Sequence, residues 1–258
     1  MKRRTLLKSL LLSLSLLSTP LLAQEKSLLI YCGITMVRPM TELARSFEQR
    51  EKLRITISQG GTEDLYQSLK KSRQGDLYLM GEPSYRAKYL GEGLLGEQRT
   101  VGYNQLTLVV PKGNPKKVKG ELSELLRKDL TIMIGNAESG SVGKETKDVL
   151  DAANLYPRVV NKAALLMPDS RAISLAMKRG DADLALNWRA TVFFPDNSQQ
   201  LEAVDLDPKH ARPQALLLNL LTFSPNPALA RKFMDYVASA DGQAVFRKYG
   251  FLDNSINR

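Results

Sequence analysis

The sequence contains one cysteine and one histidine among its 258 residues, and this scarcity excludes several kinds of site. A disulfide within the chain needs a second cysteine, and protein zinc sites combine several Cys and His ligands. The one histidine, His210, stands in a polar segment flanked by prolines, without a serine elbow or a cysteine nearby, which argues against a catalytic dyad or triad. Neither a Walker loop nor a dinucleotide fingerprint occurs. We therefore predict a protein that is not an enzyme and that uses no cofactor and no metal site.

Acidic residues are absent from the first 23 positions, where Lys2, Arg3, Arg4 and Lys8 precede or enter a stretch rich in Leu and Ser. This pattern is typical of a cleavable signal peptide, and its apolar stretch is too short and too rich in serine to span a membrane. We expect residues 1–23 to be removed on export to the periplasm. The paired arginines resemble a twin-arginine signal, while the apolar core also fits general secretion, so both routes remain open.

Excess positive charge is modest once this leader is set aside. The whole chain carries 37 Lys and Arg against 27 Asp and Glu, a net charge of +10, and removing the four basic residues of the leader leaves 33 against 27. The remaining basic residues are dispersed, and aromatic residues make up only 7% of the chain. Nucleic-acid binding is therefore not expected, although the surplus would weakly steer anions toward the protein.

Short apolar runs alternate with segments of helical period in the rest of the chain. The i, i+3, i+4, i+7 spacing of a buried helix face occurs at 40–47 and in similar form at 142–153 and 229–237. The apolar runs predict strands at residues 27–31, 53–58, 76–80, 105–110, 130–134 and 183–186. This alternation predicts an α/β fold of mostly parallel sheets flanked by helices. Cys32 follows the first strand, and we expect a buried thiol there rather than a redox site.

Two polar joints indicate where the chain divides into lobes. The first is the Gly-containing stretch 99–104, and the second is the proline-containing stretch 207–214. If the chain crosses between lobes at both joints, residues 24–103 and 214–258 form one lobe and residues 104–213 form the other. Ligands of such folds bind at the carboxyl ends of strands or between the lobes.

Four loops of small residues each follow a predicted strand and open a predicted helix. They are residues 32–35, 59–62, 140–143 and 168–171. The first N–H groups of a helix have no partner within it, and the helix dipole makes this end positive, so such loops can bind small anions. Each loop alone is better explained as an ordinary cap or turn. Four of them, divided between two lobes, favour an anion site, because they supply donors without a base or a nucleophile.

The same residues resemble a known family. Residues 30–36 and 60–65 are similar to the first and second binding loops of the periplasmic molybdate-binding proteins of ABC importers. The segments 109–115 and 242–251 also match recurrent segments of that family. The resemblance covers nearly all of the chain after the leader. It implies the two-lobed fold of type II periplasmic binding proteins, in which the ligand cleft lies between the lobes.

This resemblance also implies a set of ligand-binding residues. Thr35 and Thr62 would offer hydroxyl groups from the first lobe, and Val142 and Ser170 would offer backbone amides from the second. Trp188 stands where the family has a tyrosine whose hydroxyl donates to the anion, and an indole N–H can donate one bond in its place. Arg189, next in the chain, could clamp an oxyanion through two N–H groups or lie at the rim.

The function implied by the resemblance is that of a monomeric receptor. It would close like a hinge on a small tetrahedral oxyanion, molybdate or tungstate for example, and deliver it to the membrane permease of an ABC importer. The alternative is a receptor of the same fold that acts as a sensor or surface protein, with sulfate, phosphate or an organic anion as its ligand. Trp188 departs from the family pattern, so the sequence leaves the identity of the anion open.

Overall fold

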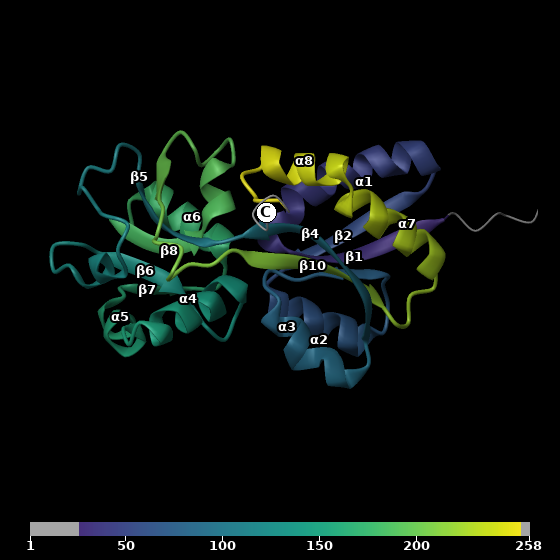
Figure 1. Ribbon diagram of the computed structural model, residues 1–258, viewed down its shortest axis with the longest axis horizontal. Coiled ribbons are helices and arrows are strands. Elements are labelled where there is room, and N and C mark those ends of the chain that lie inside the picture. The colour runs from purple at the N-terminus through teal and green to yellow at the C-terminus, as the bar shows by residue number, and fades with distance from the viewer. Residues whose placement is uncertain (1–25, 254–258) are drawn as a thin grey trace, which may run out of the picture.

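The structure, a computed structural model, describes residues 26–253 and contains two five-stranded sheets that lie side by side (Figure 1). Helices lie on both faces of each sheet, which confirms the predicted two-lobed α/β fold. The predicted signal peptide, residues 1–23, lies outside the described residues. No helix within residues 26–253 is both long and apolar enough to cross a membrane.

The first sheet contains strands from the beginning and the end of the described chain. Its strands lie in the order β2-β1-β3-β10-β4. They are β1 (Ser27–Gly33), β2 (Arg54–Gly60), β3 (Leu77–Leu79), β4 (Leu95–Asn104) and β10 (Gln214–Leu221). β1 is parallel to β2 and β3, with Ile30 opposite both Ile57 and Leu77. β10 runs antiparallel to β3 and to β4.

The second sheet is built from the middle of the chain, in the order β7-β6-β8-β5-β9. Its strands are β5 (Leu106–Pro111), β6 (Ile132–Gly135), β7 (Leu165–Met167), β8 (Leu184–Trp188) and β9 (Leu201–Val204). β6 is parallel to β7 and β8, whereas β5 runs antiparallel to β8 and β9. All six strands predicted from the sequence are present, with ends that differ by at most two residues.

The sheets are mostly parallel in strand direction, as predicted, because four of the five described strands of each sheet run the same way; β10 in the first sheet and β5 in the second run antiparallel to both of their neighbours. The reason lies in the crossings between the lobes. β4 leads the chain toward the second lobe and β10 brings it back beside β4, so the two strands run in opposite directions. β5 likewise enters the second sheet against the direction of its parallel strands.

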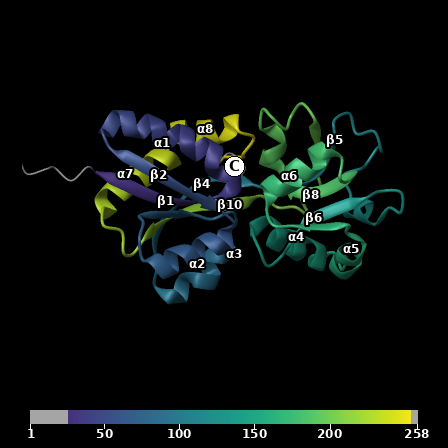
Figure 2. The same ribbon diagram turned by 180° about the vertical axis from the view of Figure 1, so that it is seen from behind.

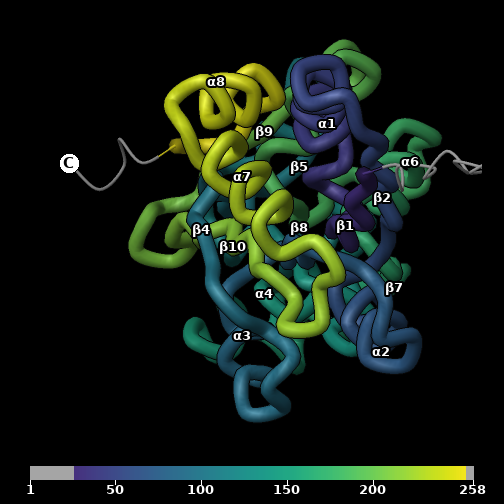
Figure 3. Tube along the Cα trace, turned by 90° about the vertical axis from the view of Figure 1, so that its right-hand side faces the viewer, coloured from purple at the N-terminus to yellow at the C-terminus, as the bar shows by residue number. Residues whose placement is uncertain are grey.

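Helices cover the two faces of each sheet. Figure 3 shows α1, α7 and α8 on one side of the first sheet and α2 and α3 on the other. In the second lobe α6 lies on one face, and α4 and α5 lie on the opposite face (Figure 2). The α-helices are α1 (Val37–Glu51), α2 (Thr62–Ser72), α3 (Ser84–Tyr89), α4 (Ser141–Ala152), α5 (Tyr156–Lys162), α6 (Ser170–Arg179), α7 (Pro227–Ala238) and α8 (Ala240–Lys248). Short 3₁₀ turns are η1 (Ile34–Met36), η2 (Leu90–Glu92), η3 (Leu122–Leu126) and η4 (Arg189–Phe193). The predicted helical segments at 40–47, 142–153 and 229–237 correspond to α1, α4 and α7.

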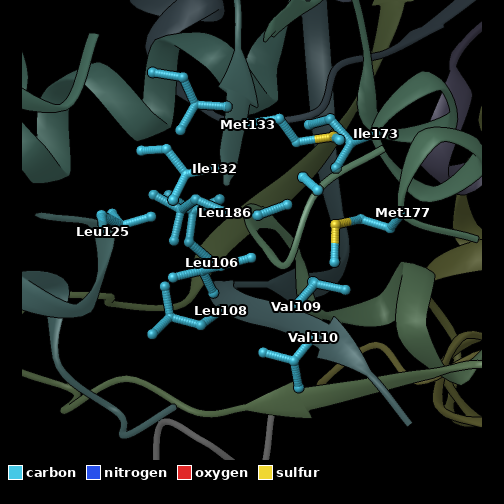
Figure 4. Packing of buried hydrophobic residues seen from close by; sticks show 14 of the residues in the cluster. Leu106, Leu108, Val109, Val110, Leu125, Ile132, Met133, Ile173, Met177 and Leu186 are labelled. Atoms are coloured by element: carbon cyan, nitrogen blue, oxygen red, sulfur yellow. The ribbon is translucent and has the colours of Figure 1, made fainter. Parts of the chain in front are cut away.

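Buried apolar side chains fill the space between sheets and helices. In the first lobe Phe47 of α1 meets Phe233 of α7 edge to face, with ring centroids 5.0 Å apart. On the opposite face of the same sheet Tyr66 and Tyr89 stack against each other. The core of the second lobe lies around β5, β6 and β8 (Figure 4). Cys32 is fully buried in the first core, as predicted, and burial raises the pKa of its thiol, which keeps it protonated and unreactive.

The joint predicted at residues 99–104 is not a loop but the second half of β4, paired with β10. The chain crosses between sheets at Asn104, whose side-chain oxygen accepts hydrogen bonds from the backbone N–H groups of Gln105 (3.1 Å) and Ala190 (3.2 Å). Of the second predicted joint, 207–214, residues 207–213 are irregular and Gln214 begins β10. Ala190 and Phe194 come from the middle of the chain yet pack in the core of the first lobe. We propose lobe boundaries at 103/104 and 213/214, as the sequence predicts.

Candidate functional site

The parallel strands of both sheets end at the boundary between the lobes. The segments that follow β1, β2, β6 and β7 open α1, α2, α4 and α6, so four helix N-termini face this boundary. Between them lies a small cavity of about 10 Å³, which we call the ion cavity. It is lined by residues 33–36, 60–62, 81, 140–142, 169, 170 and 188. This volume is about what a single water molecule needs, so the two lobes lie closed on each other here.

Two hydroxyl groups from different lobes meet in the ion cavity. Thr35 Oγ1 and Ser170 Oγ lie 2.6 Å apart, and the two residues are only 5% and 2% exposed. Thr35 belongs to the η1 turn after β1, and Ser170 is the first residue of α6. A hydroxyl can rotate to donate or to accept, so each of them can turn its hydrogen toward an anion placed between the lobes. The structure thus adds the hydroxyl of Ser170 to the backbone amide that the resemblance implies.

Thr62 is held at the cavity wall by contacts of both its side chain and its backbone. Its Oγ1 accepts a hydrogen bond from the backbone N–H of Gly81 (3.3 Å), and its carbonyl oxygen accepts one from the hydroxyl of Tyr78 (2.8 Å). The residue is 2% exposed and begins α2 without a side-chain cap. The hydroxyl hydrogen of Thr62 therefore remains available as a donor.

The N-terminus of α4 supplies backbone donors from the second lobe. α4 begins at Ser141 after Gly140 and has no side-chain cap. Its first N–H groups have no carbonyl partner within the helix, because a helix bonds each N–H four residues back. Val142, the second residue of α4, lines the ion cavity as predicted and is 2% exposed.

Trp188 closes the ion cavity at the end of β8. Its side chain is 1% exposed, and its Nε1–H donates a hydrogen bond to Ser141 Oγ at 3.3 Å. The indole N–H therefore points to the N-terminus of α4. Trp188 is also the only tryptophan of the sequence, which makes it a spectroscopic reporter of this cavity.

Arg189 does not line the ion cavity. Its Nε donates a hydrogen bond to Asp205 Oδ1 at 2.9 Å, and its guanidinium lies 4.4 Å from the centre of the Phe193 ring. These contacts draw the side chain to the surface beside η4 and β9, where it lines a separate depression. The expectation that Arg189 clamps the ligand therefore has no support in this geometry. The positive charge of Arg189 is paired instead with the carboxylate of Asp205.

The acidic side chains close to the four loops have other partners. Asp169 lines the ion cavity, but its Oδ1 caps α6 by accepting a hydrogen bond from the backbone N–H of Ala172 at 2.8 Å. Glu63 accepts hydrogen bonds from Gln67 and Lys88. Asp169 is thus the one carboxylate among the residues that line the cavity, where the other polar groups are hydroxyl, indole N–H and backbone N–H groups. No group of three or more His, Cys, Asp or Glu within residues 26–253 could hold a metal ion.

Sequence reasoning did not single out two residues of the ion cavity, Gly81 and Ser141. Gly81 lies where the lobes are closest packed in this region: a Cβ at this position would be 2.1 Å from Ser141 Oγ and 2.8 Å from Ser141 Cβ. The available signals were a glycine directly after the predicted strand 76–80 and a serine within the loop 140–143. Neither signal shows that the two positions touch.

The model of a family described as bacterial extracellular solute-binding protein matches residues 28–252, nearly all of the described chain. The chain belongs to this family. It is a solute-binding protein of the ABC importer type and not an enzyme, with the fold of type II periplasmic binding proteins. The resemblance to molybdate-binding proteins is confirmed by relatives of that kind.

Three similar proteins illustrate the range of ligands named for relatives of this chain. The molybdate-binding protein ModA of Mycobacterium tuberculosis is 20% identical over 88% of this chain and 84% of its own length. The structure of the sulfate-binding protein SubI of M. tuberculosis matches with a TM-score of 0.77 at 14% identity, covering 88% of this chain and 86% of that one. The structure of AfuA of Actinobacillus pleuropneumoniae with fructose-6-phosphate matches with a TM-score of 0.75 at 17% identity, covering 90% and 86%. At these identities the structures show a shared fold, and the ligand follows from the site itself.

Proposed function

We propose that this protein is exported to the periplasm, binds a small tetrahedral oxyanion group of the molybdate or tungstate kind in the ion cavity, and delivers it as a monomer to the permease of an ABC importer. The ligand-binding residues are Thr35 and Thr62 in the first lobe and Val142, Ser170 and Trp188 in the second. Closure of the lobes brings the two sets of donors together around the anion.

The contact between Thr35 and Ser170 carries this proposal. Their hydroxyl groups come from different lobes, are almost completely buried and lie 2.6 Å apart at the meeting point of four helix N-termini. Buried hydroxyls at this position are explained by a polar ligand between the lobes better than by packing, because apolar side chains would fill such a boundary without hydrogen-bond constraints.

The energy available from these donors suffices for tight binding. A hydrogen bond to a charged group contributes about 1.5–3 kcal/mol, and each helix N-terminus adds about 0.3–1 kcal/mol for a negative charge. Five donors and several helix ends therefore exceed the roughly 8 kcal/mol of net free energy that micromolar binding requires, with a margin for desolvation and closure. Uncharged ligands would lose most of this energy.

A thermal-shift panel tests the proposal. Molybdate, tungstate, sulfate and phosphate are added to the protein, and a ligand at about 100 times its Kd should stabilise it by roughly 2.7 kcal/mol. Thr35→Ala should weaken binding of the same ion by about 1–3 kcal/mol, because one donor is lost.

The matched control for this variant is Thr131→Ala, since Thr131 is exposed and bonds to Asp183 and Leu184 through its backbone. That variant should bind like the wild type. If none of the four ions stabilises the protein, or if Thr35→Ala binds the ion as tightly as the wild type, the proposed site is contradicted.

A further inference from the structure

A second cavity adjoins the ion cavity and is much larger. Its volume is about 180 Å³, and we call it the side cavity. It shares Ile34, Thr35 and Ser170 with the ion cavity, so the hydroxyl pair stands at the junction of the two spaces. Its other walls come from α1, α6 and the segment 191–197. α1 and α6 lie on the same side of the molecule, one in each lobe (Figure 2).

The side cavity has a surplus of positive charge. Arg38, Arg171 and Lys178 line it together with one carboxylate, Asp196. Arg38 and Lys178 both reach that carboxylate, at 2.5 Å and 3.7 Å. Arg171 donates instead to a neutral acceptor, Gln59 Oε1, at 3.0 Å. Three cations thus face one anion in this space.

A purely structural role accounts for only part of this arrangement. The pair of Arg38 with Asp196 joins the two lobes, and so does the hydrogen bond of Arg171 to Gln59. An ion pair that joins the lobes needs only one cation for each carboxylate. The carboxylate of Asp196 contacts two cations, Arg38 and Lys178. The side chain of Lys178 is only 16% exposed, and its Nζ donates a hydrogen bond to the backbone carbonyl oxygen of Asp196 at 3.2 Å. The negative charge nearest to this ammonium group is the Asp196 carboxylate, which it shares with Arg38. The excess positive charge in the side cavity therefore lies where an anionic group of a ligand would bind.

We propose that the ligand is a small organic acid with two negative groups: a tetrahedral oxyanion group, such as a phosphate monoester, in the ion cavity, and a carboxylate in the side cavity beside Arg171 and Lys178. This inference rests on the proposed function and adds the substrate class to it. The planar guanidinium of Arg171 matches a carboxylate with two parallel hydrogen bonds, whereas Lys178 acts as a point charge. The short carbon chain between the two groups passes the hydroxyls of Thr35 and Ser170.

Isothermal titration of the mature protein with four probes tests the substrate class. The probes are molybdate, inorganic phosphate, 3-phosphoglycerate, which carries a phosphate and a carboxylate, and glycerol 3-phosphate, whose tail is neutral. We expect 3-phosphoglycerate to bind at least about 10-fold more tightly than glycerol 3-phosphate, because one further charged hydrogen-bond pair contributes that much. Equal binding of these two esters, or binding of the inorganic ions alone, would overturn the inference and leave the proposed function standing. Silence of all four probes would instead contradict the proposed function.

The Arg171→Gln variant tests the assigned residue. Arg171 is exposed, so this variant should fold. It should reduce the preference for 3-phosphoglycerate over glycerol 3-phosphate to below about 3-fold, while glycerol 3-phosphate and phosphate bind as to the wild type. The control is Arg179→Gln at the other end of α6, where the guanidinium pairs with Asp181 at 2.6 Å. A preference unchanged in Arg171→Gln, or lost equally in Arg179→Gln, would overturn the assignment.

Discussion

Replacing Gly81 by alanine should weaken oxyanion binding by more than about 100-fold while leaving each lobe folded. The new methyl group would lie 2.1 Å from Ser141 Oγ and 2.8 Å from Ser141 Cβ. Rotation of the serine can move its oxygen, but its Cβ is attached to the first turn of α4. Relief therefore requires the lobes to separate, which withdraws the donors of Val142, Ser170 and Trp188 together. Three donors at about 1.5–3 kcal/mol each exceed the loss expected from any single hydroxyl.

The control for this variant is Gly91→Ala, because a Cβ at Gly91 meets no atom within 4 Å. Binding is measured by titration calorimetry, and folding by circular dichroism and thermal unfolding. Wild-type affinity in Gly81→Ala would show that the ligand does not depend on contact between the lobes at this point. The cavity between the lobes would then not be the binding site.

Raising the pH from 5 to 8 should destabilise the protein through Glu145, and Glu145→Gln should remove this effect. Glu145 in α4 is 5% exposed, and its Oε1 accepts a hydrogen bond from Gln214 Nε2, at the start of β10, at 2.8 Å. Burial raises the pKa of its carboxyl group to about 7, against the opposing effect of the hydrogen bond from Gln214. A raised pKa means that the folded state holds the proton more tightly than the unfolded chain does. The stabilisation is therefore complete below the unfolded pKa of about 4.3 and is lost as the pH rises through 7.

The expected loss is about 3 kcal/mol of unfolding free energy, from the 1.36 kcal/mol that each unit of pKa difference represents. Glutamine is neutral and can still accept the bond from Gln214. Glu145→Gln should thus match the wild type at pH 5 and exceed its stability at pH 8, in urea unfolding at the two pH values. Glu121→Gln, an exposed change, serves as the control. Parallel pH dependence of Glu145→Gln and the wild type would show that this carboxyl is not the group responsible.

Local sequence patterns predict the strands and helices that form ordinary βα units. They fail where pairing with a strand distant in the sequence determines the secondary structure. Residues 99–104 contain Gly102 and polar side chains, which is typical of a joint, yet pairing with β10 makes them a strand. Residues 214–221 form an almost continuous apolar run, and such a run has no period that separates a buried strand from a buried helix. β7 and β9 are edge strands of three and four residues, too short to show alternation.

For the site, the sequence predicts which loops take part but not how their side chains meet. Thr35, Thr62, Val142, Ser170 and Trp188 all line the ion cavity, since each stands at the end of a strand or the start of a helix. The orientation of Arg189 depends on Asp205, which comes from the segment after β9. The side cavity depends on how η1 meets α6 across the lobes, which no local pattern encodes.

The emission of Trp188 offers the most direct test of the central claim, that an oxyanion binds between the lobes. Because Trp188 is the only tryptophan and lines the ion cavity, its fluorescence reports on this place alone. Titration with an oxyanion that raises the melting temperature should change the emission saturably, with the Kd found by calorimetry, and Gly81→Ala should show no change in the same range. Binding proven by calorimetry with unaltered Trp188 emission would contradict the account, because the anion would then bind elsewhere.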